Sequence, residues 1–142
     1  MGGAVSGYLI LKTEPGDYSY DDLERDGSTV WDGVGNNAAL VHMRAAKKGD
    51  LALVYHTGNE RAAVGVARLT GDPYPDPRHD DPKRVVFDVE PVERLAAPVT
   101  LAAVKADPAF ADFALVRQGR LSAMAVPAAL WKRLLRMGRG AS

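Results

Sequence analysis

The chain has 142 residues, with 18 lysines and arginines against 18 aspartates and glutamates, so its formal net charge is zero. Its hydrophobic fraction of 46% and charged fraction of 25% exclude wholesale disorder, and its length favours a single domain over residues 1–142. The absence of cysteine excludes disulfides, thiolate zinc sites and a cysteine nucleophile. Residues 113–142 carry +6 and residues 1–112 carry −6, a division that favours a charged partner.

Targeting signals are not expected in this sequence. The opening residues have no basic region and only a short apolar run, and no segment reaches the roughly 18 apolar residues of a membrane span. We therefore expect a protein of the reducing cytoplasm, without a membrane partner.

The first half of the chain predicts short strands and two helices, separated by turn residues. In chain order these are a buried strand at Tyr8–Lys12, one or two helical turns from a Ser19–Asp22 capping box through Arg25, a short extended piece at Thr29–Trp31, a helix at Ala38–Lys47, an interior strand at Leu51–Tyr55 and a return strand at Ala62–Leu69. Asn36 or Asn37 is the expected N-cap of the second helix. Gly65, inside the return strand, predicts a bulge or a close backbone approach.

The second half begins with an irregular surface loop, because residues 72–83 hold four prolines and four aspartates. Val85–Glu90 alternates between apolar and polar positions and predicts a half-exposed strand. Thr100 caps a short helix that ends before Pro108, and Pro127 opens a terminal helix through Met137. Several short strands with few long helices predict a small barrel that is mainly β or α+β.

No catalytic, metal or cofactor site emerges from the motifs. Gly33–Ala38 spells G-x-G-x-x-A, but the strand before it is too short and polar for a dinucleotide fold. His42, His56 and His79 lack metal-ligand spacing, and Ser122 lacks the G-x-S-x-G context of a serine hydrolase. We therefore expect neither an enzyme nor a bound metal or cofactor.

Polar and aromatic residues gather at the ends of the predicted strands. Lys12 and Thr13 end the first strand, Trp31 the second, and Tyr55 and His56 the most apolar one. Small barrels form pockets at such ends, and these pockets accept a flat ligand such as a base removed from its stack. Composition by itself favours the alternative that Trp31 and Tyr55 belong to the core and Lys12 to the surface.

An ordered set of motifs resembles the EVE domain family across roughly residues 8–135. The matching segments are Lys12–Pro15, Tyr18–Leu23, Trp31–Asn36, Lys48–Asp50, Tyr55–Thr57, Val64–Ala67, Pro73–Pro77, Pro98–Leu101, Lys105 with Pro108, and Leu115–Ser122, followed by the Trp131 helix. The family is similar to YTH and ASCH domains. The resemblance implies an α+β, PUA-like fold, which is a small, mostly antiparallel β barrel flanked by short helices, with its core at roughly residues 8–137.

The resemblance further implies a non-catalytic domain that binds RNA or DNA and holds a modified or extruded base in an aromatic-lined pocket. The residues that match the family's motif positions around this pocket are Lys12, Thr13, Trp31, Asp32, Asn36, Tyr55, His56, Thr57, Arg120, Leu121 and Ser122. By residue type, Trp31 suits stacking on the base, while Lys12 and Arg120 suit a phosphate. Asp32, Asn36 and Ser122 suit the edges of the base, and a buried Asp32 needs partners from the nearby backbone or Asn36.

The chain departs from the family pattern at four positions. Gly35 and Leu40 stand where the pattern has arginine, Val41 stands where it has asparagine, and Val85 stands where it has tryptophan. These departures remove phosphate-binding charge from the helix beside the pocket and one aromatic side chain. The alternative function is an accessory domain that binds a nucleoside, a metabolite or a protein partner through the same pocket.

Overall fold

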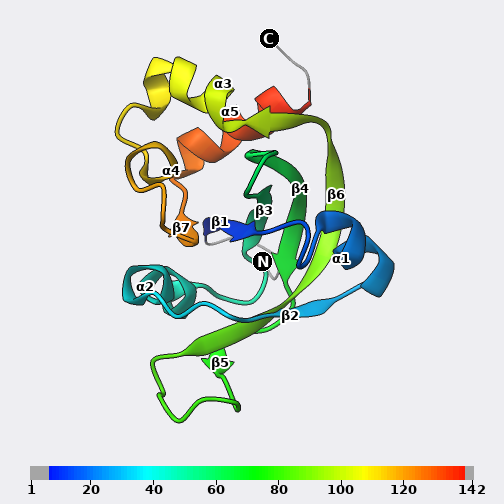
Figure 1. Ribbon diagram of the computed structural model, residues 1–142, viewed down its shortest axis with the longest axis vertical. Helices are drawn as coiled ribbons and strands as arrows, with labels where there is room; N and C mark the ends of the chain where they lie inside the picture. Colours follow the sequence, from blue (N-terminus) through cyan, green and yellow to red (C-terminus); the bar gives the residue numbers. More distant parts are fainter. Residues whose placement is uncertain (1–6, 140–142) are drawn as a thin grey trace.

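The computed structural model describes residues 7–139, which form a curled β-sheet surrounded by short helices (Figure 1). Residues 1–6, where no targeting signal is expected, and residues 140–142 lie outside the described residues. The strands are β1 (Tyr8–Thr13), β2 (Thr29–Trp31), β3 (Leu51–His56), β4 (Ala62–Leu69), β5 (Tyr74–Pro75), β6 (Val85–Thr100) and β7 (Ala123–Ala125). The helices are α1 (Tyr20–Asp26), α2 (Asn37–Ala45), α3 (Leu101–Ala106), α4 (Ala114–Arg117) and α5 (Ala128–Gly138), with a 3-10 turn η1 at Pro108–Phe110.

The sheet has the strand order β2-β6-β4-β3-β1-β7, and β5 pairs with β6. β1 and β3 run parallel, whereas the other strand pairs within residues 7–139 are antiparallel. The sheet is curled into a half-barrel (Figure 1). It remains open between β2 and β7, which are the two end strands of this order. The expected α+β class with a mostly antiparallel, barrel-like sheet is confirmed, and β3 is the interior strand that the sequence predicted.

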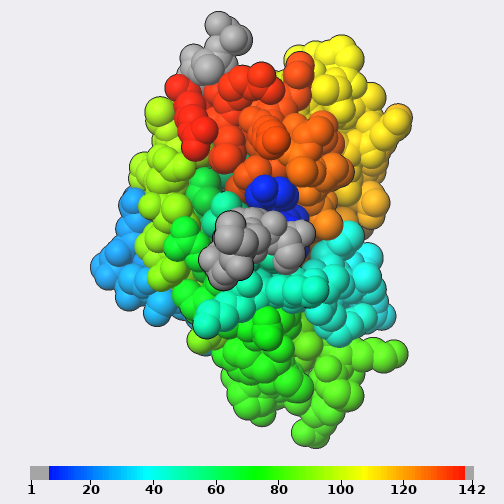
Figure 2. Space-filling model, turned by 180° about the vertical axis from the view of Figure 1, so that it is seen from behind, coloured from blue at the N-terminus to red at the C-terminus, as the bar shows by residue number. Residues whose placement is uncertain are grey.

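Four of the five α-helices within residues 7–139 lie toward opposite ends of the half-barrel, whereas α1 lies at its side next to β6 (Figure 1). α3, α4 and α5 gather at the top of Figure 1, whereas α2 and the loop that contains β5 lie at the bottom. From behind, α2 (cyan) meets the green segment around residues 72–83 (Figure 2), and Arg44 Nη1 donates a hydrogen bond to the Lys83 carbonyl at 2.9 Å. The proline-rich loop is therefore held against α2.

Local sequence signals account for the beginnings of α1 and α2. Ser19 Oγ accepts a hydrogen bond from the Asp22 amide, and the Asp22 carboxylate accepts one from the Ser19 amide, which confirms the predicted capping box. Asn36 Oδ1 accepts from the Ala39 amide, so Asn36 is the N-cap of α2. This helix ends at Ala45, two residues earlier than expected.

The two later helices begin close to their predicted starts. Thr100 Oγ1 accepts a hydrogen bond from the Ala103 amide and caps α3, which ends before Pro108 as predicted. Pro127 is the N-cap of α5, and this helix ends one residue beyond the expected Met137.

β6 corrects the expected half-exposed strand at Val85–Glu90. The strand continues to Thr100, and Val86, placed on the exposed side by the alternating pattern, is buried. Pro91 and Pro98 lie inside β6, where proline normally argues against a strand. Two register shifts against β4 accommodate them, and such irregularities are not encoded in a two-residue repeat.

Gly65 is the point of close approach that the sequence predicted. The register of β4 against β6 shifts just before it, and a Cβ atom at this position would lie 2.4 Å from the ring of Tyr20. Tyr20 is fully buried, and its hydroxyl donates to the Val66 carbonyl at 2.7 Å. The missing side chain of Gly65 therefore creates the space that α1 needs to pack on the sheet.

The hydrophobic core fills the inside of the curled sheet and extends under the helices. Among its buried side chains are Ile10, Leu53, Phe87 and Trp131, and the Trp131 ring stacks on Tyr8 with centroids 4.7 Å apart. Each such burial contributes roughly 1.5–3 kcal/mol to folding. No helix within residues 7–139 is long and apolar enough to cross a membrane.

Candidate functional site

A hollow of about 390 Å³ lies where the end of β1, the turn before α1 and β2 meet. Its lining residues are Thr13, Asp17, Tyr18, Thr29, Val30, Trp31 and Asp32. Three of these, Thr13, Trp31 and Asp32, are among the site residues that the sequence predicted. The ends of strands that are distant in the sequence thus meet at one place.

Trp31 serves as a wall of this hollow while belonging to the core. The residue is only 6% exposed, and β2 pairs it with the fully buried Phe87 of β6. Trp31 is therefore a core residue, as composition favoured, that also borders the hollow. Because little of the indole is exposed, Trp31 presents a small part of its surface to the hollow.

Asp32 differs from the expectation of a buried carboxylate. Its side chain is 43% exposed, and its partner is Arg78, whose Nη2 lies 2.6 Å from Asp32 Oδ2. Arg78 also contacts Asp76, a buried carboxylate in the loop after β4 whose pKa is lowered by a hydrogen bond from the Arg78 amide. The loop at residues 72–83 is thus attached to the rim of the hollow by an exposed ion pair.

A second, shallower hollow of about 270 Å³ lies beside the segment that follows β2. Its lining residues are Asn36, Ala38, Gln118, Gly119, Arg120 and Leu121, of which three belong to the predicted set. Arg120 is exposed, whereas Leu121 is buried and faces the core. Asn36 is occupied in part by its capping bond to α2.

Lys12 lies between the two hollows, because it precedes Thr13 of the first and its side chain contacts Gly119 of the second. Its ammonium group donates to the Gly119 carbonyl at 3.0 Å and lies 5.5 Å from the centre of the Tyr55 ring. Burial of this side chain lowers the pKa of Lys12 from its usual value. Tyr55 is buried beneath Lys12 and lines neither hollow. Its ring therefore supports the Lys12 side chain, whereas the prediction placed Tyr55 at the ligand.

Thr57 and Ser122 hold the end of β1 in place. The Thr57 amide donates to the Thr13 carbonyl at 2.9 Å, and the Lys12 amide donates to the Ser122 carbonyl at 2.9 Å. Both residues are half-buried and line neither hollow. They position Lys12 and Thr13, whereas the sequence placed them around the ligand.

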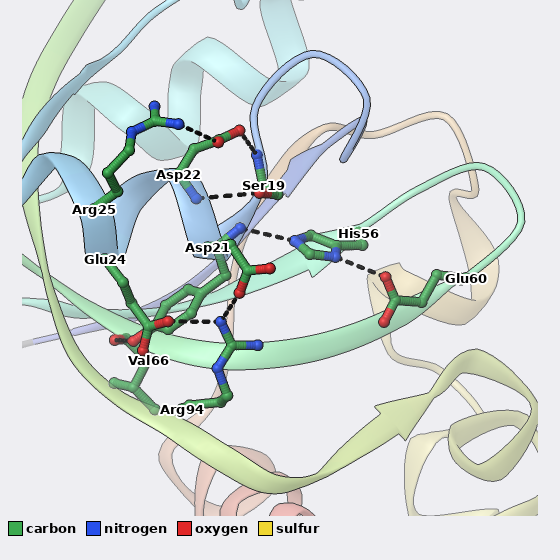
Figure 3. Close-up of polar contacts among 10 residues, drawn as sticks. Ser19, Asp21, Asp22, Glu24, Arg25, His56, Glu60, Val66 and Arg94 are labelled. Carbon is green, nitrogen blue, oxygen red and sulfur yellow. Dashed lines mark hydrogen bonds and ion pairs between the residues drawn. The ribbon is translucent and has the colours of Figure 1, made fainter.

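His56 corrects the predicted site most clearly. Its imidazole points toward the beginning of α1 (Figure 3), where Nε2 accepts a hydrogen bond from the Tyr20 amide at 3.0 Å. Nδ1 therefore carries the proton and donates to Glu60 Oε1 at 2.7 Å. A buried histidine satisfied at both nitrogens is a structural link between β3 and α1 and has no free atom for a ligand.

Arg94 of β6 completes the attachment of α1 to the sheet. Its guanidinium forms ion pairs with Asp21 and Glu24 on α1 (Figure 3) and lies 5.1 Å from the centre of the Tyr20 ring. Mainly through burial, the pKa of Tyr20 rises from 10.0 to about 12.

The raised pKa of Tyr20 predicts a loss of stability at alkaline pH. The unfolded chain ionises this phenol near pH 10 and the folded chain near pH 12, so its contribution is complete below pH 10 and disappears as the pH rises to 12. Thermal unfolding measured across this range should show a falling Tm. Tyr20→Phe should show a shallower fall, and identical slopes for both proteins would contradict the assignment.

Sequence reasoning did not name Tyr18, which lines the first hollow, or Arg78, which pairs with its lining residue Asp32. Tyr18 lies in the motif after β1, and Thr13 Oγ1 donates to its carbonyl at 2.7 Å, which links the end of β1 to the turn before α1. Arg78 lies 46 positions from Asp32, in a loop that looks like a plain solvated turn. Within residues 7–139 no group of three histidine or carboxylate side chains is placed to hold a metal ion.

A family model described as "EVE domain" matches residues 7–137. This chain belongs to the EVE domain family. The match extends from β1 to the last turn of α5 and confirms the resemblance from which the site residues were predicted. Human thymocyte nuclear protein 1 is 28% identical over 127 residues, which cover 71% of this chain and 56% of that protein. This EVE chain thus spans about half the length of the curated relatives it matches.

Solved structures share the fold of this EVE domain. Rpa0253 from Rhodopseudomonas palustris has a TM-score of 0.88 at 40% identity, with 93% of this chain and 92% of that chain covered. Human THYN1 protein, solved in complex with DNA containing 5-methylcytosine, has a TM-score of 0.85 at 24% identity, with 94% and 98% covered. ASCH from Zymomonas mobilis has a TM-score of 0.59 at 9% identity, with 92% and 95% covered. The PUA-like architecture is thereby confirmed.

Proposed function

We propose that this EVE domain binds nucleic acid without catalysis and holds a modified or extruded base in the hollow beside Trp31. The observation that carries the proposal is the likeness, over almost the whole chain, to the human THYN1 structure that contains 5-methylcytosine DNA. The hollow supports it, because about 390 Å³ falls within the roughly 300–1,000 Å³ typical of small-molecule sites.

The chemistry of the lining fits a methylated pyrimidine. Asp17 and Asp32 offer carboxylate oxygens that accept from an exocyclic amino group, as carboxylates do when they read cytosine N4. Asp32 keeps one oxygen available, because Arg78 contacts only Oδ2. Val30 and Trp31 supply apolar surface for a methyl group on the base.

Cations at the rim fit the phosphates that accompany such a base. Lys12 and Arg120 form no ion pair with a carboxylate in the described part of the chain, so their charge is available to an anionic ligand. Contacts of this kind position the strand, whereas contacts to base edges determine which base is chosen.

Titration of short single-stranded and duplex oligonucleotides tests this proposal. Oligonucleotides with 5-methylcytosine, N6-methyladenine or unmodified bases are compared by fluorescence anisotropy at several salt concentrations. We expect binding that weakens steeply with salt and a preference for one modified base. Asp32→Ala should reduce this preference roughly 5- to 100-fold, the loss of one good base contact, and leave the salt dependence intact.

Asp80→Ala is the matched control for Asp32→Ala. Asp80 is exposed and lies in the same loop as Arg78, so the substitution removes the same charge without touching the hollow. Equal effects of both variants would reject the hollow as the base site. Binding of a free nucleoside that is stronger than that of any oligonucleotide and independent of salt would instead favour a metabolite-binding domain.

A further inference from the structure

Arg84 lies against the segment that joins the two hollows. It directly precedes β6, whose Phe87 pairs with Trp31 at the end of β2. The three outer atoms of its guanidinium lie 3.3–3.5 Å from the point that a Cβ atom on Gly35 would occupy. The absence of a side chain at Gly35 leaves the space in which this cation lies.

Within residues 7–139 the Arg84 side chain has no hydrogen-bond or ion-pair partner. Its Nε is buried without a hydrogen-bond acceptor, and its terminal nitrogens form no ion pair or hydrogen bond with any residue from 7 to 139. Neighbouring arginines differ, because Arg78 contacts Asp32 and Asp76, and Arg44 donates to the Lys83 carbonyl. Buried donors in native proteins are almost always paired, so a half-buried, unpaired guanidinium indicates an acceptor supplied from outside.

The acceptor that fits this position is a phosphate. A guanidinium presents its donors as a planar fork, which matches two oxygens of one phosphate. No carboxylate within residues 7–139 pairs with Arg84, and the Asp32 carboxylate at the edge of the first hollow pairs with Arg78 instead. Residues 32–36 link Asp32 of the first hollow to Asn36 of the second, so a phosphate bound by Arg84 beside Gly35 would lie between the two hollows.

We propose that Arg84 binds a backbone phosphate of the bound strand beside Gly35. This inference rests on the proposed function and adds to it a phosphate-binding residue outside the predicted set. Gly35, which departs from the family pattern by losing an arginine, admits a guanidinium from the start of β6 instead.

The test compares Arg84→Gln with wild type on the oligonucleotide that wild type binds best. We expect affinity to fall about tenfold, the effect of one charged hydrogen-bonding contact. The slope of log K against log salt should decrease in magnitude by about 0.7 for a single strand or 0.9 for a duplex, as one phosphate contact is lost. The preference among bases should stay unchanged, and Tm should not fall, because Arg84 has no partner in the free protein.

Arg136→Gln is the matched control, since Arg136 is an exposed arginine on α5, at the opposite end of the molecule from residues 72–83 (Figure 1). Equal weakening by both variants would mean a general charge effect and would overturn the inference. Arg84→Lys provides a second variant, in which we expect the wild-type salt slope with an intermediate affinity.

The outcomes separate this inference from the proposed function. Wild-type binding of an oligonucleotide, with the same affinity and slope for Arg84→Gln, overturns the phosphate contact and leaves the proposed function standing. A fall in Tm for both Arg84 variants with an unchanged salt slope indicates a structural role and likewise overturns it. Failure of wild type to bind any oligonucleotide overturns both proposals.

Discussion

Replacing Gly65 with alanine should destabilise the protein by about 3 kcal/mol or more. The added Cβ would lie 2.4 Å from the Tyr20 ring, so this fully buried ring must move and break its hydroxyl bond to Val66. The movement would also displace the ring from the Arg94 guanidinium and loosen α1 from the sheet. Chemical denaturation followed by circular dichroism gives the free energy of unfolding directly.

Gly71→Ala is the control for the Gly65 substitution. No atom of residues 7–139 lies within 4 Å of a Cβ at Gly71, and its backbone does not adopt a positive φ, so stability should stay the same or rise slightly. Combining Gly65→Ala with Tyr20→Leu should cost less than the sum of the two single changes, because the clash disappears with the ring. A loss below 1 kcal/mol for Gly65→Ala would show that Tyr20 does not pack as described.

Trp31→Ala should lower the free energy of unfolding by about 3–5 kcal/mol, the range for removing a large buried aromatic side chain. The indole is only 6% exposed and lies beside Phe87, so its removal leaves a cavity between β2 and β6. Loss of oligonucleotide binding by this variant would therefore reflect folding as well as contact with a base. Trp31→Phe keeps an aromatic wall and is the better variant for binding studies.

Val30→Ala provides the matched control on the same strand. Val30 is 42% exposed, and its truncation should change stability by no more than about 0.5 kcal/mol. Should Trp31→Ala prove as mild as Val30→Ala, the indole would have to be an exposed platform, contrary to its burial. Circular dichroism follows both variants without depending on tryptophan fluorescence, to which Trp131 also contributes.

Neighbours in the sequence account for the local placement of several predicted site residues. Thr13 and Trp31 lie at strand ends because apolar runs stop there, and Asn36 caps α2 because its side chain reaches an amide three residues on. His56 was assigned to the ligand from the same kind of signal, yet its partner, the Tyr20 amide, lies 36 positions away. The type of a strand-end residue is therefore visible in the sequence, whereas its partner is not.

The opposite net charges of residues 1–112 and 113–142 do not correspond to the distribution of unpaired cations in the structure. The positive C-terminal part contributes Arg120 to the second hollow, but Arg133 on α5 pairs with Asp107. Meanwhile the acidic, proline-rich loop contributes Arg78, which pairs with Asp32, and Arg84 directly after the loop lies beside Gly35. Net charge by segment did not predict which cations remain available to a ligand.

The sequence by itself determined β1, β2, β3 and β4, the N-caps of α1, α2 and α3, the close backbone approach at Gly65, and the family. These features follow from local periodicity, capping chemistry and ordered motifs, each contained within a few neighbouring residues. Only the tertiary structure decided that Asp32 pairs with Arg78, that His56 supports α1, and that Arg84 lies unpaired on Gly35. The physical reason is that strand register and loop path, which depend on packing of the whole sheet, determine which distant side chains meet.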